Sequence, residues 1–295
     1  MTPKHPLEAI TQSSLTLACQ HYENFPVASV FLPQYLRQPI SLIYSFARQA
    51  DDFADEGDLS IEQRLSLLNS FRDELDLLYA YIKPPSALFV ALGEIIKTHN
   101  LPYQAFYDLL DAFSQDVIKT RYHDYDELLD YCKRSANPIG RLLLQLYGQA
   151  NAANIQLSDR ICSALQIINF LQDIAIDFKK NEGKQRIYLS QEEMAGFGIT
   201  ERQIQDYVDG LKLVDTHWQQ FMLFNLSRVN ALLYAGKPLG RILPGRIGFE
   251  MRMIVAGGER IISKISAVNG DIFRHRPTLN YTDWIFVFFK ALFKM

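Results

Sequence analysis

Residues 165–178, LQIINFLQDIAIDF, are apolar around most of a helix and polar along a single line. At about 100° per residue, four polar side chains share one sector of that helix: Gln166, Asn169, Asp173 and Asp177. Leu, Ile and Ala fill most of the remaining circumference. Helices of this kind are surrounded by protein. The segment therefore predicts a buried helix that directs one polar row at a single place.

Residues 44–55, YSFARQADDFAD, repeat this design nearer the N-terminus. Four polar side chains fall within a sector roughly 60° wide: Tyr44, Arg48, Asp51 and Asp55. Phe and Ala cover the opposite half of the helix. Because charged residues are rarely buried without partners, either this segment lies on the surface or a positive group lies beside it.

Helical periodicity continues through nearly the whole chain. Apolar residues recur at spacings of three and four in residues 34–55, 61–82, 86–98, 103–119, 138–149, 157–180, 201–233 and 248–268. Alternating strand patterns bounded by tight hairpin dipeptides are absent. The pattern predicts an all-α bundle of about ten helices in inner and outer layers, with residues 1–295 forming a single domain.

Composition excludes several classes of protein. The formal net charge of −3 disfavours broad nucleic-acid binding, which needs a strongly basic surface. The three cysteines form no CxxC pair, so a disulfide framework or zinc site is not expected. The first residues lack the apolar core of a signal peptide, and no apolar run reaches the roughly 20 residues of a membrane span. A cytoplasmic location is expected.

The C-terminal residues 281–295 include the aromatic stretch WIFVFFKALFKM, in which Lys290 and Lys294 are four residues apart. One interpretation is a helix that rests on a membrane surface. The other is a terminal helix docked on the protein's own core, since amphipathicity alone does not separate the two. Both interpretations stay open at this stage.

The spacing of the carboxylates points to a metal. Carboxylates four residues apart on a helix lie about 6 Å apart along its axis, where like charges repel. A divalent cation removes that repulsion, and an all-oxygen set of Asp, Asn and Gln suits Mg²⁺. A single DxxxD pair is more often solvated surface, but two pairs on apolar helices favour a metal site. Two such rows facing each other across a cleft would hold a metal-bound diphosphate, with Arg48 and Arg186 near its oxygens.

These motifs resemble a known family. IYSFARQADDFAD and LQIINFLQDIAIDF are similar to the two aspartate-rich motifs of the squalene and phytoene synthases. TRYHDYDELLDYC (120–132) resembles the family's RYxxFDEL stretch, and QRIYLS (185–190) its RIYL segment. The resemblance runs from about His21 to Arg276. It implies the class I terpenoid synthase fold, an all-α bundle around a central cavity.

Two further segments are similar to one branch of that family, the hydroxysqualene synthases of hopanoid pathways: HYENFPVASVFLP (21–33) and KRSANPIGRLLL (133–144). This resemblance implies Mg²⁺-dependent ionisation of presqualene diphosphate, with water capture giving hydroxysqualene and diphosphate. No nicotinamide cofactor is then expected. The alternatives are a synthase that couples two prenyl diphosphates to presqualene diphosphate, squalene or phytoene, and, from another class, a non-catalytic helical adaptor.

The resemblance also assigns residues to roles. The implied metal ligands are Asp51, Asp55, Asn169, Asp173 and Asp177. The implied catalytic or diphosphate-contacting residues are Tyr44, Arg48, Gln166, Arg186 and Tyr188. The implied substrate-binding residues are His21, Tyr22, Asn24, Phe25, Ala136, Asn137 and Gln172. Gln172 departs from the pattern, because relatives often carry Arg there.

The partners implied are a prenyl diphosphate lipid and other enzymes of the same pathway, without nucleic acid. Because such a substrate is a lipid, peripheral contact with the inner face of the membrane is also expected.

Overall fold

Every regular element in residues 33–179 and 186–293, the part of the chain that the computed structural model describes, is helical. Within these ranges the only strand-like pairing is an isolated bridge between Tyr122 and Ser190. The all-α prediction is therefore confirmed. The predicted substrate-binding residues His21, Tyr22, Asn24 and Phe25 lie outside the described residues.

The chain forms two compact units. The first unit comprises residues 1–119 and 138–151, and the second comprises residues 120–137 and 152–295. The organisation of residues 1–295 as a single domain stays a prediction.

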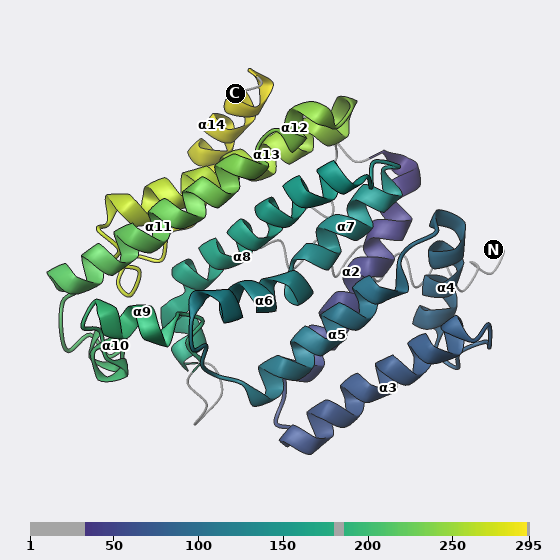
Figure 1. Ribbon diagram of the computed structural model, residues 1–295, viewed down its shortest axis with the longest axis horizontal. Coiled ribbons are helices and arrows are strands. Elements are labelled where there is room, and N and C mark those ends of the chain that lie inside the picture. The colour runs from purple at the N-terminus through teal and green to yellow at the C-terminus, as the bar shows by residue number, and fades with distance from the viewer. Residues whose placement is uncertain (1–32, 180–185, 294–295) are drawn as a thin grey trace, which may run out of the picture. The chain divides into compact units, whose positions relative to one another are not determined.

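The first unit is built around α2. Its helices are α2 (Gln34–Asp55), α3 (Ile61–Tyr79), α4 (Ala87–His99), α5 (Tyr103–Ile118) and all but the first residue of α7 (Asn137–Leu146). Helix α2 packs against α3, α4 and α5 (Figure 1). The fully buried ring of Phe46 on α2 meets Phe71, Phe89 and Phe106 at centroid distances of 5.3–5.8 Å. This aromatic core fixes which face of α2 is buried.

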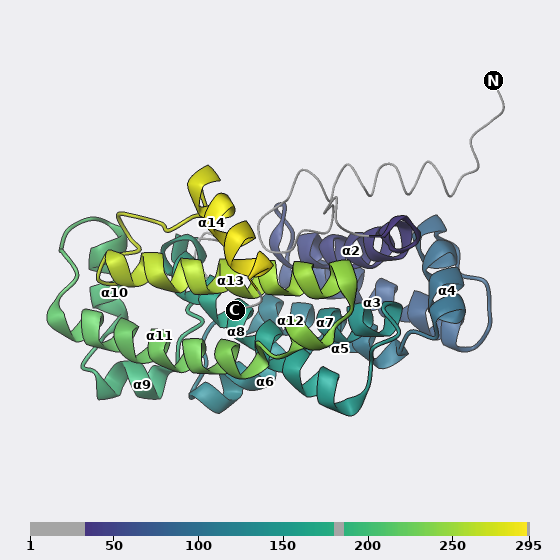
Figure 2. The ribbon, with the colours of Figure 1, turned by 90° about the horizontal axis from the view of Figure 1, so that it is seen from above.

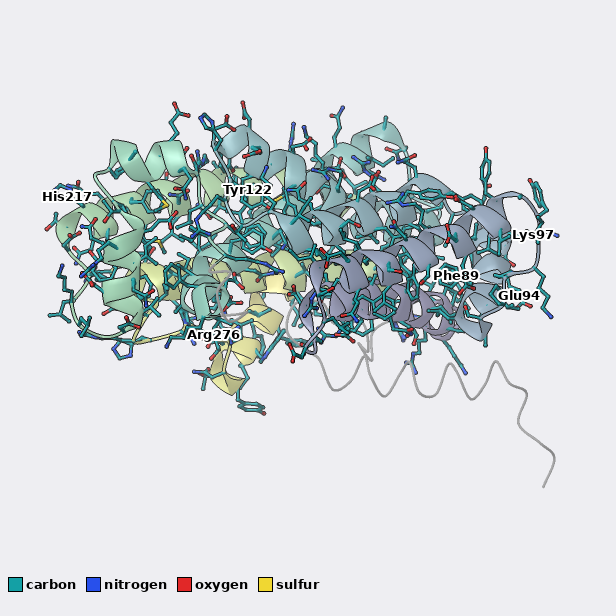
Figure 3. The ribbon with its side chains drawn as sticks, turned by 90° about the horizontal axis from the view of Figure 1, so that it is seen from below. Phe89, Glu94, Lys97, Tyr122, His217 and Arg276 are labelled. Carbon is teal, nitrogen blue, oxygen red and sulfur yellow. The ribbon has the colours of Figure 1, made fainter. Side chains whose placement is uncertain are left out.

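Helix α4 illustrates how sequence sets the position of an element in this unit. The Ser86 hydroxyl caps the N-terminus of α4 by accepting from the backbone N–H of Phe89, and left-handed Asn100 ends the helix. Figure 3 shows Phe89 among the helices, while Glu94 and Lys97 on the same helix lie at the outer surface. The helix therefore buries one apolar face, as its periodicity indicates.

The second unit is organised around α8. Its remaining helices are α6 (Tyr125–Ser135), α8 (Ala152–Lys179), α9 (Gln191–Gly196), α10 (Glu201–Val208), α11 (Thr216–Gly236), α12 (Leu239–Ile242), α13 (Gly245–Ala267) and α14 (Tyr281–Leu292). Helices α8, α11 and α13 pack against one another (Figure 1). A Cβ at Gly236 would lie 2.8 Å from the Leu157 carbonyl oxygen, and one at Gly258 would lie 2.9 Å from Leu165. Both glycines therefore permit close approach to α8.

Among the described residues, α8 is the one helix whose length and composition would allow it to cross a membrane. Of its apolar window, 56% is buried inside the protein. The core helices of soluble proteins can have the same length and composition. Helix α8 is the helix around which the second unit packs.

One segment predicted as a single helix forms two helices. Residues 201–233 were expected to form a single helix, but α10 ends at Val208 and α11 begins at Thr216. Gly210 adopts a left-handed conformation with φ of +69°, and the Asp215 carboxylate caps α11 by accepting from the backbone N–H of Trp218 at 2.9 Å. Apolar periodicity continues across this interruption, so it gave no sign of the turn.

Candidate active site

The first polar row lies on α2, and its Arg48 contacts carboxylates of the same helix. Arg48 Nη1 donates to Asp51 Oδ2 at 3.2 Å, and Arg48 Nη2 lies 2.7 Å from Asp52 Oδ1. The same guanidinium lies 3.7 Å from Glu56 Oε1. Burial raises the pKa of the Tyr44 phenol, and the Asp51 and Asp52 carboxylates raise it further against the opposing effect of Arg48. The Tyr44 hydroxyl therefore remains a hydrogen-bond donor at neutral pH.

Two carboxylates next to this row were not assigned a role from the sequence. Asp52 and Glu56 both approach Arg48, although only Asp51 and Asp55 were assigned. The i, i+4 spacing of Arg48 and Asp52 was visible in the sequence. Asp51, Asp52 and Asp55 are all half-buried, so the row combines partial desolvation with a high density of negative charge.

Arg64 on α3 holds the end of the first row. Its guanidinium donates to the carbonyl oxygens of Phe53 at 3.1 Å, Glu56 at 3.0 Å, Gly57 at 2.6 Å and Leu59 at 3.2 Å. The last carbonyls of a helix lack intrahelical partners, so these bonds satisfy groups that surround Asp55. Arg64 is 9% exposed. It is a positioning residue that sequence reasoning missed.

The second polar row lies on one continuous helix, α8, as predicted. Gln166, Asn169, Asp173 and Asp177 are all half-buried. Asp173 is held from outside α8: Arg276 Nε donates to its Oδ1 at 2.6 Å, and Arg276 Nη2 donates to its Oδ2 at 3.2 Å. A two-point Arg–carboxylate contact of this kind is among the stronger polar interactions in proteins. Arg276 is a second residue that was not assigned a role from the sequence.

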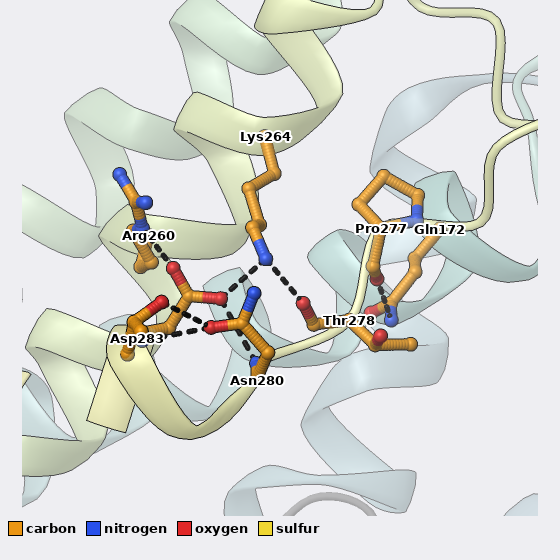
Figure 4. A network of polar contacts seen from close by, with 8 residues as sticks. Gln172, Arg260, Lys264, Pro277, Thr278, Asn280 and Asp283 are labelled. Carbon is orange, nitrogen blue, oxygen red and sulfur yellow. Dashed lines mark hydrogen bonds and ion pairs between the residues drawn. The ribbon is translucent and has the colours of Figure 1, made fainter. Parts of the chain in front are cut away.

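Gln172 on α8 contacts the residue that follows Arg276. Its Nε2 donates to the carbonyl oxygen of Pro277 at 2.6 Å, and its side chain is buried. The neighbouring residues Gln172 and Asp173 therefore hold the neighbouring residues Pro277 and Arg276 (the Gln172 contact is drawn in Figure 4). The assignment of Gln172 as a substrate contact stays a prediction, and its observed contact positions Arg276.

Arg186 and Tyr188 belong to a buried group at the C-terminal end of the second row. The backbone N–H of Arg186 donates to the carbonyl oxygen of Asp177 at 3.3 Å, and Arg186 Nη1 donates to Tyr188 Oη at 3.4 Å. The Tyr188 ring stacks on Phe170 of α8, with centroids 4.2 Å apart and planes 3° apart. Both Arg186 and Tyr188 are less than a tenth exposed.

Two more rings complete this aromatic group. Tyr122 and Tyr131 lie 5.6 and 5.7 Å from Tyr188, centroid to centroid. Figure 3 labels Tyr122 and Arg276, which both belong to the second unit. Both tyrosines stand in the 120–132 segment, whose resemblance to the family assigned a role to neither of them. We name Tyr122, Tyr131, Phe170 and Tyr188 together the aromatic box.

The substrate-binding assignment at residues 136–137 falls at the end of α6. Ala136 caps the C-terminus of α6. The Asn137 Oδ1 accepts a hydrogen bond from the Ser163 hydroxyl of α8 at 2.9 Å, and both side chains are buried. This bond fixes Asn137 against the helix that carries the second row. Contact of either residue with substrate stays a prediction.

Acidic residues near 124–127 mark the start of helix α6. Asp124 caps α6 by accepting from the backbone N–H of Glu127 at 2.8 Å. That bond lowers the pKa of Asp124, and the His123 side chain lowers it further. His123, Asp124 and Glu192 bring ligand atoms within 4.8 Å of one another, but His123 and Glu192 are exposed. Capping accounts for Asp124 without a metal.

The chemistry of both rows fits Mg²⁺. Every predicted ligand offers oxygen, and each row carries half-buried carboxylates. In each row an arginine contacts a predicted ligand: Arg48 contacts Asp51, and Arg276 contacts Asp173. These guanidinium groups show that positive charge is accommodated beside both carboxylates, which is the property a divalent cation requires.

Comparison with known proteins agrees with this chemistry. The squalene/phytoene synthase family profile matches residues 19–282. A hydroxysqualene synthase of Rhodopseudomonas palustris is 32% identical over 271 residues, covering 92% of this chain and 88% of that protein. A presqualene diphosphate synthase of the same organism is 35% identical over 178 residues, covering 60% of this chain and 61% of that protein.

A solved structure gives the same result. The crystal structure of the squalene synthase HpnC from Alicyclobacillus acidocaldarius matches with a TM-score of 0.79 and 31% identity, covering 89% of this chain and 95% of that one. The predicted isoprenoid synthase-like helical fold is thereby confirmed. The chain belongs to the squalene/phytoene synthase family.

Proposed function

We propose that this enzyme is a hydroxysqualene synthase, which ionises presqualene diphosphate and lets water capture the resulting cation. The products are hydroxysqualene and diphosphate. The observation that carries the proposal is the presence of two oxygen-rich rows on α2 and α8 in a chain that matches a hydroxysqualene synthase over 92% of its length. Membership of a family that acts on prenyl diphosphates disfavours the helical adaptor.

The metal ligands in this proposal are Asp51 and Asp55 from the first row and Asn169, Asp173 and Asp177 from the second. Bound Mg²⁺ would stabilise negative charge on the leaving diphosphate. The half-buried setting of the rows strengthens such electrostatic stabilisation, because fewer water molecules compete for the charges.

Three positive or donor groups beside the rows act on the diphosphate directly. Arg48 and Arg186 supply guanidinium groups, and Tyr44 donates a hydrogen bond from its protonated phenol. Gln166 stands one turn before Asn169 on the second row and offers an amide. These assignments follow from the resemblance and from the position of each group on or next to a row.

The aromatic box suits the carbocation that remains after diphosphate leaves. A ring face attracts positive charge by about 0.5–2 kcal/mol without acting as a nucleophile. Tyr188 and Phe170 are buried, and their rings stack on each other. Capture by water requires no hydride donor, and we propose that the enzyme uses no nicotinamide cofactor.

Coupling of two prenyl diphosphates is the second candidate. The specific observation that favours it is the 35% identity to a presqualene diphosphate synthase. That match spans 60% of the chain, whereas the hydroxysqualene synthase match spans 92%. The broader match supports ionisation of presqualene diphosphate as the first candidate. Because substrate and product are both lipids, we also propose that the enzyme acts at the inner face of the membrane with other enzymes of its pathway.

Substrate assays distinguish the two candidates. Purified enzyme with Mg²⁺ should convert presqualene diphosphate to hydroxysqualene, should leave farnesyl diphosphate unchanged, and should show the same rate with and without NADPH. Conversion of farnesyl diphosphate without any turnover of presqualene diphosphate would replace the first candidate with the second. Chelation of the metal should stop the reaction in either case.

A further inference from the structure

Helix α14 has its apolar face outward. Seven exposed side chains on it and its cap are apolar or aromatic: Tyr281, Trp284, Ile285, Phe286, Phe289, Leu292 and Phe293. Its buried side chains are only Asp283, Val287 and Ala291. A surface helix of a globular protein normally turns its apolar side toward the core. Figure 2 shows α14 on the outside of α13.

A buried carboxylate holds the start of α14. Asp283 is 1% exposed and lies against two residues of α13: Arg260 Nε donates to its Oδ1 at 2.6 Å, and Lys264 Nζ donates to its Oδ2 (Figure 4). Lys264 also donates to the carbonyl oxygen of Thr278 at 2.6 Å. The Asn280 side chain caps the helix by accepting from the backbone N–H of Asp283. The first turn is therefore fixed by polar contacts.

Polar contacts also hold the last turn. Lys290 Nζ lies 2.7 Å from Glu259 Oε2, and Arg252 Nε donates to the carbonyl oxygen of Ala291 at 2.7 Å. The Arg252 contact satisfies a terminal carbonyl of α14. With both ends anchored to α13 in this way, the outward aromatic side chains are not needed to attach the helix.

The outward face continues onto α13 and includes an open, shallow hollow. Its lining is Met253 from α13 together with Trp284, Ile285, Phe288 and Phe289. Every one of these side chains is apolar or aromatic. The exposed side chains and this hollow together form one surface, which we call the α14 face.

The charge around the α14 face differs from that of the whole protein. Residues 239–295 contain nine Lys and Arg but only four Asp and Glu, whereas the whole chain contains 30 and 33. All four carboxylates of this segment are buried or half-buried, while Arg241, Arg246 and Arg274 are exposed. An apolar surface in a segment whose exposed charges are cationic complements the headgroups and acyl chains of an anionic bilayer.

We propose that the α14 face docks on the surface of an anionic lipid bilayer. Helix α14 has 12 residues, which span about 18 Å and fall short of the roughly 30 Å hydrocarbon core, so it lies on the membrane without crossing it. Trp284 and Tyr281 stand where aromatic side chains meet the interface. Docking through the α14 face does not depend on which head-to-head reaction the enzyme performs.

Vesicle sedimentation tests the proposal with the full chain. Wild-type protein should bind phosphatidylcholine vesicles that contain about 30% phosphatidylglycerol, and binding to pure phosphatidylcholine should be weaker by about fivefold or more. The double variant Ile285→Glu/Phe289→Glu should lower the bound fraction by about tenfold. The matched control Leu211→Glu/Leu213→Glu removes two exposed leucines elsewhere in the second unit and should bind as the wild type does.

A second measurement needs no destabilising change. Brominated lipids should quench the fluorescence of Trp284, whereas Trp218 is 0% exposed and should be spared. A Trp284→Phe variant should lose the quenching. Absence of binding to anionic vesicles, or equal binding by both double variants, would overturn the proposal. The proposal would also be overturned if the protein formed a dimer without lipid and only the Ile285→Glu/Phe289→Glu substitutions abolished that dimer. The α14 face would then bind a second copy of the chain.

Discussion

Arg276 holds the Asp173 carboxylate at both oxygens, with Nε 2.6 Å from Oδ1 and Nη2 3.2 Å from Oδ2. Asp173 is also a proposed Mg²⁺ ligand. The same oxygens cannot serve a guanidinium and a metal with full strength, so Arg276 competes with Mg²⁺ for Asp173 in the substrate-free enzyme.

Replacement of Arg276 by Gln should therefore increase the affinity for Mg²⁺ alone. A partly exposed charged contact contributes about 0.5–1.5 kcal/mol, which corresponds to an increase of roughly two- to thirteenfold. Calorimetric titration without substrate measures the change. Arg274→Gln is the matched control, because it removes the same charge from an exposed position two residues away. Equal effects of the two variants would mean that net charge, and not the Asp173 contact, sets the affinity.

Arg64→Ala should destabilise the first unit by about 1–3 kcal/mol, because it leaves carbonyl groups at the end of α2 without donors. Arg72→Ala on the same helix removes a half-exposed contact with Asp111 and should cost less than about 1 kcal/mol. Denaturant unfolding compares the two. Arg64→Ala should also weaken Mg²⁺ binding, since Asp55 lies in the turn that Arg64 holds. Normal stability and normal metal affinity would show that the turn is fixed without Arg64.

Asp283 makes the attachment of α14 sensitive to acid. Burial opposes its ionisation, but hydrogen bonds from Lys264, from the Asn280 backbone and from Arg260 lower its pKa to about 2. A depressed pKa stabilises the folded state above the unfolded value near about 4, and this stabilisation is lost as pH falls toward 2. The Tm difference between wild type and Asp283→Asn should therefore be largest at neutral pH and shrink below about pH 4. A pH-independent difference would contradict the account; Asp58→Asn, at an exposed position, controls for loss of one carboxylate.

Phe170→Leu should lower kcat by about tenfold or more while KM changes little, because the ring faces Tyr188 and is proposed to stabilise the cation and not to bind the diphosphate. Phe197→Leu removes a ring of the same unit that contacts Phe221 and Phe224. It should leave kcat near the wild-type value. A fall in Tm equal for both variants, with no selective loss of kcat, would make Phe170 a packing residue only.

The helical fold could be predicted from periodicity because α2 and α8 are apolar around most of their circumference. Helix α2 occupies residues 34–55 as predicted. The polar rows followed from the same spacing, since residues four apart share a helix face. Pattern reasoning failed at residues 209–215, where apolar spacing continues across a turn.

The residues that position the rows could not be predicted in this way. Arg276 reaches Asp173 across 103 positions of sequence, and Arg64 binds backbone carbonyls, which have no sequence signature. The α14 face shows a further limit. Periodicity indicates an amphipathic segment but does not tell which of its sides is covered, because that depends on the pairing of Asp283 with α13.

Oxygen labelling tests directly whether water captures the cation formed from presqualene diphosphate. The purified enzyme is incubated with presqualene diphosphate and Mg²⁺ in water enriched in ¹⁸O, and the products are analysed by mass spectrometry. We expect hydroxysqualene whose hydroxyl oxygen carries the label of the water, together with release of diphosphate. Unchanged presqualene diphosphate, or a hydrocarbon product without oxygen, would contradict this expectation.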